Sequence, residues 1–406
     1  KVTFKDEDGT ELLTKRVYFE NSNKQGTIII PNIENTKGEK EFLCWKIDLN
    51  EYIPGSNYTV TQDIIFTAYY SKLTDPEGAK PIGSTIIEGD ANKGIVIRDS
   101  NENEWVWVEV PKNITAGKIT DVDIENALQI YASDYREGST GQGCNWKDEW
   151  YNGCGMSENE YNTAKHKMLQ SIKTNGGFWI SRYEAGIEGT NTDTTNNEIP
   201  NVRYSHSDIT KDSPKAVSQV DRIPYNFVTC SEAQTLASAM STDSNKTSSL
   251  LFGIQWDLTC KFIETKTNIT TVDIKTDSTS WGNYKNSSIK LTRGRYNVSS
   301  GNSSTVWKKF NVNTDNYVTN LQTSSDVNYT QLLTTGASEQ TKKMNIYDFA
   351  GNEWEWTLEK TSYASYPCAH RGGSFYYPRS DSPASCRIYT DTAYNSTGIS
   401  FRSTLY

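Results

Sequence analysis

The sequence predicts an α+β protein with a small β-rich domain at 1–73 and a larger mixed domain at 80–406. A chain of 406 residues is longer than one ordinary domain and can bury a large core. Short apolar runs separated by Gly, Asn and Pro turns dominate the first 72 residues, which is typical of strands. Beyond residue 80, such runs alternate with segments whose apolar residues recur at helical spacing, and this mixture indicates helices together with sheets.

The small domain contains four predicted strand segments and one tight turn. The strand segments lie at 2–4, 17–19, 42–45 and 64–70, and the turn runs from Asp6 to Thr10. The order of these landmarks resembles the Listeria-Bacteroides repeat, a small β-grasp-like module that serves as a stalk in bacterial surface proteins. Cys44 departs from that family, which usually has Gly before the Trp. The resemblance implies a spacer role, and a short linker at 74–78 follows the module.

The larger domain begins with alternating strands and helices. A Trp-rich strand is predicted at 105–111, and a helix with regular apolar spacing follows at 123–131. A longer helix starts at Ser157, where Glu160 completes a capping box, and it ends at Gly176. The remaining segments are a strand at 177–184, a helix capped by Ser231 to Gln234, a helix at 250–264, and a loop-rich insertion at about 265–335 anchored by Trp281, Tyr284 and Trp307.

The string from Asn345 to Thr357, NIYDFAGNEWEWT, is the most specific motif of the chain. Together with RGGSF at 371–375 and GISFR at 398–402, it resembles the formylglycine-generating enzyme family, a subgroup of the C-type lectin fold. The segments at 177–184 and 224–228 fit the same family. The resemblance covers roughly 80 to 406 and implies a C-type lectin fold of the formylglycine-generating-enzyme type.

The resemblance also implies a structural calcium ion beside this string. In the family, the positions that match Asp348, Gly351, Glu353 and Glu355 surround Ca²⁺, with Gly351 and Glu353 binding through backbone oxygens. Hard oxygen ligands suit this metal. The alternative is that Asp348 caps a turn and Glu355 pairs with a buried Arg.

The same string also predicts a strand with two different faces. Alternation in a strand would bury Trp354 and Trp356 on one face and place Glu353 and Glu355 on the other.

Two substitutions argue against the family's oxidase activity. The copper-binding members use two Cys at positions that match Tyr377 and Ser382 here. A thiolate is the soft ligand that holds Cu(I), and neither a phenol nor a hydroxyl replaces it. The only histidines, at 166, 206 and 370, are dispersed along the sequence. We therefore expect no copper and no enzymatic activity.

The last 46 residues, 361–406, contain no Lys, Glu, Gln, Met or Trp, although these types supply 81 of the 406 residues. About nine would be expected at the average usage of the chain. An asparagine codon, AAC or AAT, whose two adenines are replaced at random can encode fifteen amino acids. The five that it cannot encode are the five that are missing here. The segment therefore resembles the variable region of a protein diversified by a diversity-generating retroelement. A chance fluctuation in composition is the alternative.

The predicted variable region covers about 370–406. Its mixture of Tyr with small polar residues is typical of binding surfaces, because Tyr adds rigid amphipathic area and small polar groups adapt. Between the candidate contacts, Pro383, Ala384, Arg387, Phe401 and Arg402 match core positions of the family and are expected to be buried. The candidate ligand-binding residues are Phe375, Tyr376, Tyr377, Arg379, Ser380, Asp381, Ser382, Cys386, Ile388, Tyr389, Thr390, Asp391, Tyr394, Asn395 and Ser396.

The seven cysteines form no Cys-x-x-Cys motif that would indicate a zinc or redox site. Cys144 and Cys154 flank Gly-rich turns and form either a small disulfide loop or two free thiols. Cys230 and Cys260 lie in predicted helices and are expected in the core. Cys368 and Cys386 fall in the biased tail, where diversification alone could have introduced them.

Charge and hydropathy limit the partners. A net charge of −9 without a basic run argues against nucleic acid, and no apolar run is long enough to insert into a membrane. The chain lacks an initiating Met and begins inside a strand pattern, so we expect a fragment of a longer protein. We expect a monomer on the bacterial cell surface, or on a phage virion, that binds an unknown protein or surface ligand. The alternatives are a non-diversified adhesin or lectin and a residual enzyme.

Overall fold

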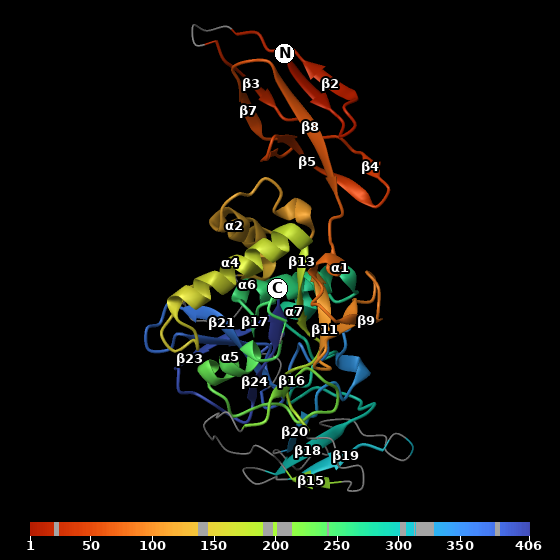
Figure 1. Ribbon diagram of the computed structural model, residues 1–406. Coiled ribbons are helices and arrows are strands. Elements are labelled where there is room, and N and C mark those ends of the chain that lie inside the picture. The colour runs from red at the N-terminus through yellow and green to blue at the C-terminus, as the bar shows by residue number, and fades with distance from the viewer. Residues whose placement is uncertain are drawn as a thin grey trace. The chain divides into compact units, whose positions relative to one another are not determined.

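The computed structural model describes residues 1–19, 24–136, 145–189, 198–200, 213–241, 243–300, 306–311, 313, 329–377 and 382–406 (Figure 1). The chain divides into two compact units. Unit 1 comprises 1–78, 109–131 and 169–177, and unit 2 comprises 79–108, 132–168 and 178–406. The secondary structure is a mixture of helices and several sheets, in agreement with the predicted α+β class.

Unit 1 includes two segments that the sequence assigned to the larger domain. These segments are 109–131 and 169–177. Backbone hydrogen bonds join both of them to the end of 1–78, because Asp75 N donates to Asn175 O at 2.6 Å and Lys112 N donates to Leu73 O at 2.9 Å. The linker predicted at 74–78 also contains a short helix, α1 (Pro76–Ala79). Hydrogen bonds between segments that are far apart in sequence therefore decide which residues belong to this unit. The local sequence does not reveal these bonds.

The main sheet of unit 1 has the strand order β2-β1-β8-β5-β4, with β6 paired to β5. The first strand, β1, runs parallel to β8 and antiparallel to β2. Phe4 stacks on Phe66 and meets the edge of Trp45, each with ring centroids 4.9 Å apart, so the core is aromatic. The strand predicted at 17–19 is absent, and Val17 packs against the core from a non-strand segment. The elements are β1 (Val2–Lys5), β2 (Glu11–Lys15), β4 (Thr36–Lys37), β5 (Lys40–Ile47), β6 (Asn50–Tyr52), β8 (Ile64–Ser71), the separate pair β3 (Gly26–Ile29) and β7 (Asn57–Val60), η1 (Lys112–Ile114) and α2 (Asp121–Tyr131).

Two sheets and a group of helices frame unit 2. The first sheet has the order β17-β25-β13-β11-β10-β9, and the second has the order β12-β21-β22-β23 with β24 paired in parallel to β21. Their strands are β9 (Thr85–Glu88), β10 (Val96–Arg98), β11 (Glu104–Glu109), β12 (Trp146–Lys147), β13 (Gly177–Ser181), β17 (Ser248–Leu250), β21 (Trp354–Thr361), β22 (Cys368–Arg371), β23 (Arg387–Thr390), β24 (Ile399–Phe401) and β25 (Ser403–Leu405). A two-stranded sheet joins β14 (Gly186–Ile187) to β16 (Ala216–Val217).

Two of the helices begin at side-chain caps that the sequence contains. The capping box predicted for α4 (Glu158–Asn175) is confirmed, because Ser157 N donates to Glu160 Oε2 at 2.8 Å and Glu160 N donates to Ser157 Oγ at 3.3 Å. For α5 (Cys230–Ser238) the cap is Thr229, whose side chain accepts from Glu232 N, and not the predicted Ser231. The remaining helices are α3 (Ser133–Arg136), α6 (Gly253–Lys266), α7 (Thr271–Lys275) and η3 (Glu339–Thr341).

The predicted loop-rich insertion at 265–335 contains regular structure. Besides α7, the strands β18 (Arg295–Ser300), β19 (Val306–Lys309) and β20 (Tyr329–Leu333) join β15 (Glu198–Pro200) in a four-stranded sheet. The Asn-, Ser- and Thr-rich composition of the insertion as a whole favours a loop, although β18 itself begins with the alternating sequence Arg-Tyr-Asn-Val-Ser. The predicted anchors Trp281, Tyr284 and Trp307 are buried, as expected.

Candidate ligand-binding surface

Two arginines of the C-terminal segment are fixed inside unit 2 by ion pairs. Arg371, at the end of β22, contacts Asp257 of α6 at 2.8 Å and Glu359 of β21 at 3.2 Å. Arg387, at the start of β23, contacts the same two carboxylates at 2.5 and 3.1 Å. Burial alone would raise the pKa of Asp257, but the charges of Arg387 and Arg371 hold that pKa below its ordinary value. Removing one partner of such a buried group leaves an uncompensated charge, so these pairs fix the strands in place.

Three tyrosines of the same C-terminal segment are exposed. Tyr376 is 55% exposed, Tyr377 46% and Tyr394 41%. The rings of Tyr376 and Tyr377 lie 5.6 Å apart in an edge-to-face arrangement. Tyr394 is also close to Tyr377. Partial burial raises the pKa of Tyr377, and the nearby hydroxyls of Tyr394 and Tyr376 raise it further. We call Tyr376, Tyr377 and Tyr394 the tyrosine patch.

A second aromatic group lies at the turn between β21 and β22. Tyr363 and Tyr366 lie in the turn between β21 and β22, and their rings approach that of Tyr389 at 4.9 and 5.9 Å. Tyr363 is 38% exposed and Tyr366 47%. Neither was among the predicted contacts, because the predicted variable region began at about 370. The signal that could have found them is the composition itself, since the five residue types are already missing from Thr361 onward.

The predicted contacts fall into three groups in the structure. Tyr376, Tyr377 and Tyr394 are exposed, whereas Ile388, Tyr389, Thr390, Asp391, Asn395 and Ser396 are half-buried. Phe375, Ser382 and Cys386 are buried and pack inside unit 2, so we leave them out of the surface. Arg379, Ser380 and Asp381 lie outside the described residues.

The positions predicted to be core are buried. Pro383, Ala384, Arg387, Phe401 and Arg402 are all inaccessible to solvent. Trp354 and Trp356 are buried as well, and Trp356 Nε1 donates to Val228 O at 2.9 Å. Burial of the tryptophans thus agrees with the sequence, but Glu353 and Glu355 are buried too. Trp354 and Trp356 both contact the ring of His370, whereas Glu355 pairs with Arg402. The predicted alternation therefore agrees with the contacts, and both faces of β21 are covered.

The side chains proposed for calcium are engaged by protein groups. Asp348 accepts hydrogen bonds from Gly336 N at 2.7 Å and from Thr341 Oγ1 at 2.8 Å. Glu355 pairs with Arg402 through both carboxylate oxygens, at 2.8 and 3.1 Å. The carboxyl of Glu353, which is not the group that would bind calcium, accepts from Asn226 Nδ2 at 3.3 Å, and burial raises its pKa well above the ordinary value.

These contacts match the alternative role, in which Asp348 caps a turn and Glu355 neutralises a buried Arg. The fourth predicted ligand, Gly351, has φ +71° and donates its N–H to Gly372 O at 2.9 Å. Within the described ranges, no group of three or more His, Cys, Asp or Glu is arranged to hold a metal ion. The side chains of Asp348 and Glu355 therefore fit a structural role, and calcium binding through the backbone oxygens of Gly351 and Glu353 stays a prediction.

The two described histidines lie in different elements, whereas Cys230 and Cys368 hydrogen-bond to each other, and Tyr151 Oη lies 3.3 Å from Cys230 Sγ. His166 is exposed on α4, and His206 lies outside the described residues. His370 is buried beside Trp354 and Trp356, with ring centroids 4.7 and 5.5 Å away, and burial lowers its pKa to about 3. The six described cysteines are buried and form no disulfide with one another. Cys144 lies outside the described residues, so its pairing with Cys154 stays a prediction.

No helix among the described residues is long and apolar enough to cross a membrane.

Comparison with known proteins gives little further guidance. No protein-family model matches the chain, and no curated protein matches it. Among solved structures, the chain is similar to Treponema denticola variable protein 1, with 11% sequence identity and a TM-score of 0.28 over 56% of this chain and 84% of that chain. A similarity of this size carries no argument about function, which must be argued from the residues themselves.

Proposed function

We propose that this protein is a non-enzymatic ligand-binding protein whose C-terminal surface is diversified by a retroelement through adenine-directed mutagenesis. The observation that carries the proposal is the absence of Lys, Glu, Gln, Met and Trp from 361–406. The tyrosine patch would form the variable contact surface, and Tyr363 and Tyr366, which precede the predicted variable region, would form a second exposed aromatic group. A protein or another surface ligand would bind there, outside the cell or on a virion.

The ion pairs support a fixed frame beneath a variable surface. Arg371 and Arg387 take their carboxylate partners from Asp257 and Glu359, and Arg402 takes its partner from Glu355. All three carboxylates lie outside the biased segment. Diversification within 361–406 would therefore leave one side of every such pair untouched. A rigid scaffold that carries exposed, exchangeable side chains is the arrangement in which binding residues usually occur.

The proposal excludes the oxidase chemistry of the family that the sequence resembles. Tyr377 is exposed and Ser382 is buried, and these are the positions where that family has its copper thiolates. Neither residue supplies a thiolate for Cu(I). Binding is thus the function to test.

The binding surface can be tested by comparing a patch variant with a matched control. Wild-type protein, a triple Tyr376→Ala, Tyr377→Ala, Tyr394→Ala variant and a Tyr18→Ala control would be screened on arrays of bacterial-surface proteins and glycans. Tyr18 is 78% exposed and lies in unit 1, so it controls for the loss of an exposed Tyr. We expect at least one ligand that wild type and control bind and that the patch variant loses.

Thermal melts separate loss of contact from loss of fold. Because the patch is exposed, the triple variant should lose about 0.5 kcal/mol or less per site. Trp356→Ala should instead lose roughly 3–5 kcal/mol through the cavity it leaves. If the triple variant melts as early as Trp356→Ala, or binds every ligand that wild type binds, the patch is not a binding surface.

A further inference from the structure

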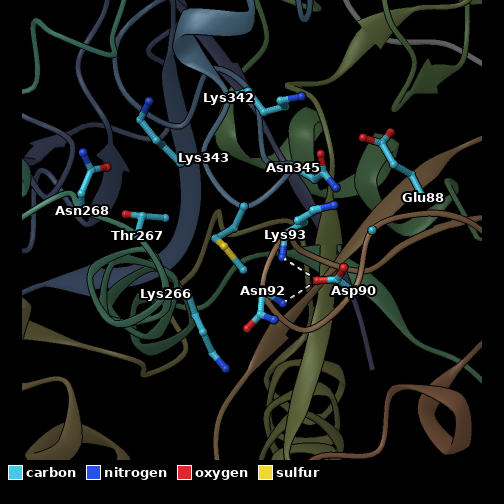
Figure 2. A pocket seen from close by; sticks show the side chains of 12 residues that line it. Glu88, Asp90, Asn92, Lys93, Lys266, Thr267, Asn268, Lys342, Lys343 and Asn345 are labelled. Atoms are coloured by element: carbon cyan, nitrogen blue, oxygen red, sulfur yellow. Dashed lines mark hydrogen bonds between the residues drawn. The ribbon is translucent and has the colours of Figure 1, made fainter.

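A second candidate site of unit 2 is a cavity of about 570 Å³ whose lining is rich in lysine (Figure 2). Three segments form it: the connection from β9 to β10, the end of α6 and the residues after η3. Lys93, Lys266, Lys342 and Lys343 come from these three segments. In Figure 1, β9 and β23 lie on opposite sides of unit 2, so the cavity is separate from the proposed binding surface.

The backbone segments at 89–94 and 344–345, which border the cavity, pack closely against each other. Gly89 and Gly94 both have positive φ, and a Cβ on Gly94 would lie 2.0 Å from Met344 O. Asn345 Nδ2 donates to Gly94 O at 2.8 Å, which ties the two segments together. Met344 and Asn345 themselves have φ of +48° and +64°, a region that residues with a side chain rarely occupy. Strained backbone of this kind persists where the surrounding contacts hold it, and it is concentrated at functional sites.

The two carboxylates in the lining are occupied by other partners. Glu88 pairs with Arg182 at 2.6 Å. Asp90 accepts the backbone N–H groups of Asn92 and Lys93 at 2.8 and 3.1 Å (Figure 2). With four lysines against two carboxylates, the lining has a formal charge of +2 in a chain whose net charge is −9.

Burial affects two of the four lysines, Lys343 and Lys342. Lys343 Nζ donates to the backbone oxygen of Gln340 at 3.2 Å, and burial lowers the pKa of Lys343. Lys342 has an ion pair with Glu339 at 2.6 Å, and burial lowers its pKa as well. Lys266 lies in the last turn of α6, where its charge also complements the helix carbonyls. A bound anion would offset the desolvation of Lys342 and Lys343, so these two residues are the ones to test.

We propose that this cavity binds a small ligand that carries a tetrahedral oxyanion, a phosphate or sulfate ester on a body of about the size of a sugar. The volume sets the size, because small-molecule pockets usually span about 300–1,000 Å³ and a free phosphate would fill only a part of this one. The lysines set the charge, because an ammonium acts as a point charge that suits phosphate. The site is independent of the proposed diversified surface.

Calorimetric titration of the whole chain tests the proposal with defined probes. Glucose 6-phosphate and glucose 6-sulfate carry the two oxyanions, and glucose is the neutral control. We expect saturable binding of at least one ester, weaker binding at high salt, and no binding of glucose. Comparing the two esters shows which oxyanion the site prefers.

Variants locate the binding. A double Lys342→Gln, Lys343→Gln variant should bind the ester at least about tenfold more weakly, since two charges at the site are lost. Lys343→Arg should retain most of the affinity. Lys147→Gln removes an exposed lysine outside the cavity and should bind as wild type does. If the double variant does not fold, Lys93→Gln on the facing segment should show the same loss.

Two results would overturn the proposal. One is the absence of saturable binding of both esters to the wild-type protein at low salt. The other is wild-type affinity in a folded double variant and in Lys93→Gln, because the anion would then bind elsewhere.

Discussion

His370 shows how a single buried residue couples the fold of unit 2 to pH. Its Nδ1 is buried without a hydrogen-bond partner, and the ring contacts Trp354 and Trp356. Burial disfavours the imidazolium and lowers the pKa to about 3. An unfolded His titrates near 6.5, so between that pH and about 3 the unfolded chain binds a proton that the folded protein does not. This residue therefore makes the protein less stable as the pH falls through that range.

Between pH 7 and pH 4, wild type should lose about 3 kcal/mol more stability than His370→Gln. The measurement is urea unfolding of both proteins at the two pH values. Other titrating groups are shared by both proteins and cancel in the comparison. Equal losses in the two proteins would show that His370 is protonated in the folded state or is solvated.

Residue burial could be predicted where it follows from residue type. Trp354 and Trp356 were expected in the core because large aromatics are usually buried, and they are. A buried Arg was expected for Glu355 only as an alternative and without a named partner, because the partner, Arg402, lies 47 residues away in sequence. Phe375 and Ser382 were misassigned to the surface for a similar reason. They lie in irregular backbone, where no periodicity separates the inside from the outside.

At the scale of elements, the cap of α5 gives a test with an internal control. Thr229 Oγ1 accepts from Glu232 N at 3.3 Å, and Glu232 Oε2 accepts from Thr229 N at 2.8 Å. Thr229→Ala should therefore destabilise the protein by about 1 kcal/mol, the usual value of an N-cap. Ser231→Ala, two residues later, should change stability by less than about 0.5 kcal/mol. Thermal melts compare the two, and a larger loss in Ser231→Ala would restore the cap that the sequence predicted.

Elements with local signals were predicted well, and elements held by distant partners were not. The helices α2 and α4 carry apolar spacing or a capping box within the helix itself. The strands β18, β19 and β20 are short segments within a polar insertion, and they pair with one another across no more than the 28 residues of 301–328. The helix predicted at 250–264 begins instead at Gly253, because residues 248–250 pair with β25 as β17.

At the scale of the whole molecule, the proposal describes a binder without a metal centre. We expect a purified sample to contain no stoichiometric copper and to leave a Cys-x-Pro-x-Arg peptide unmodified, because the thiolates that copper needs are absent at Tyr377 and Ser382. Chelation with EDTA should leave the melting temperature unchanged, because Asp348 and Glu355 already have protein partners. Elemental analysis, peptide mass spectrometry and melts with EDTA measure these outcomes. Formylglycine in the peptide, or a melt that calcium restores after chelation, would contradict them.

The central claim concerns the origin of the C-terminal surface, and its most direct test is DNA sequencing of the gene and its flanks. The account predicts a nearby, near-identical repeat of the region that encodes about 370–406, together with a reverse-transcriptase gene. It also predicts that the two copies differ mostly where the repeat has adenine, because the five missing residue types of 361–406 are those that randomised asparagine codons cannot encode. Flanks with neither the repeat nor the reverse transcriptase, or sibling genes that differ at random bases, would contradict the account.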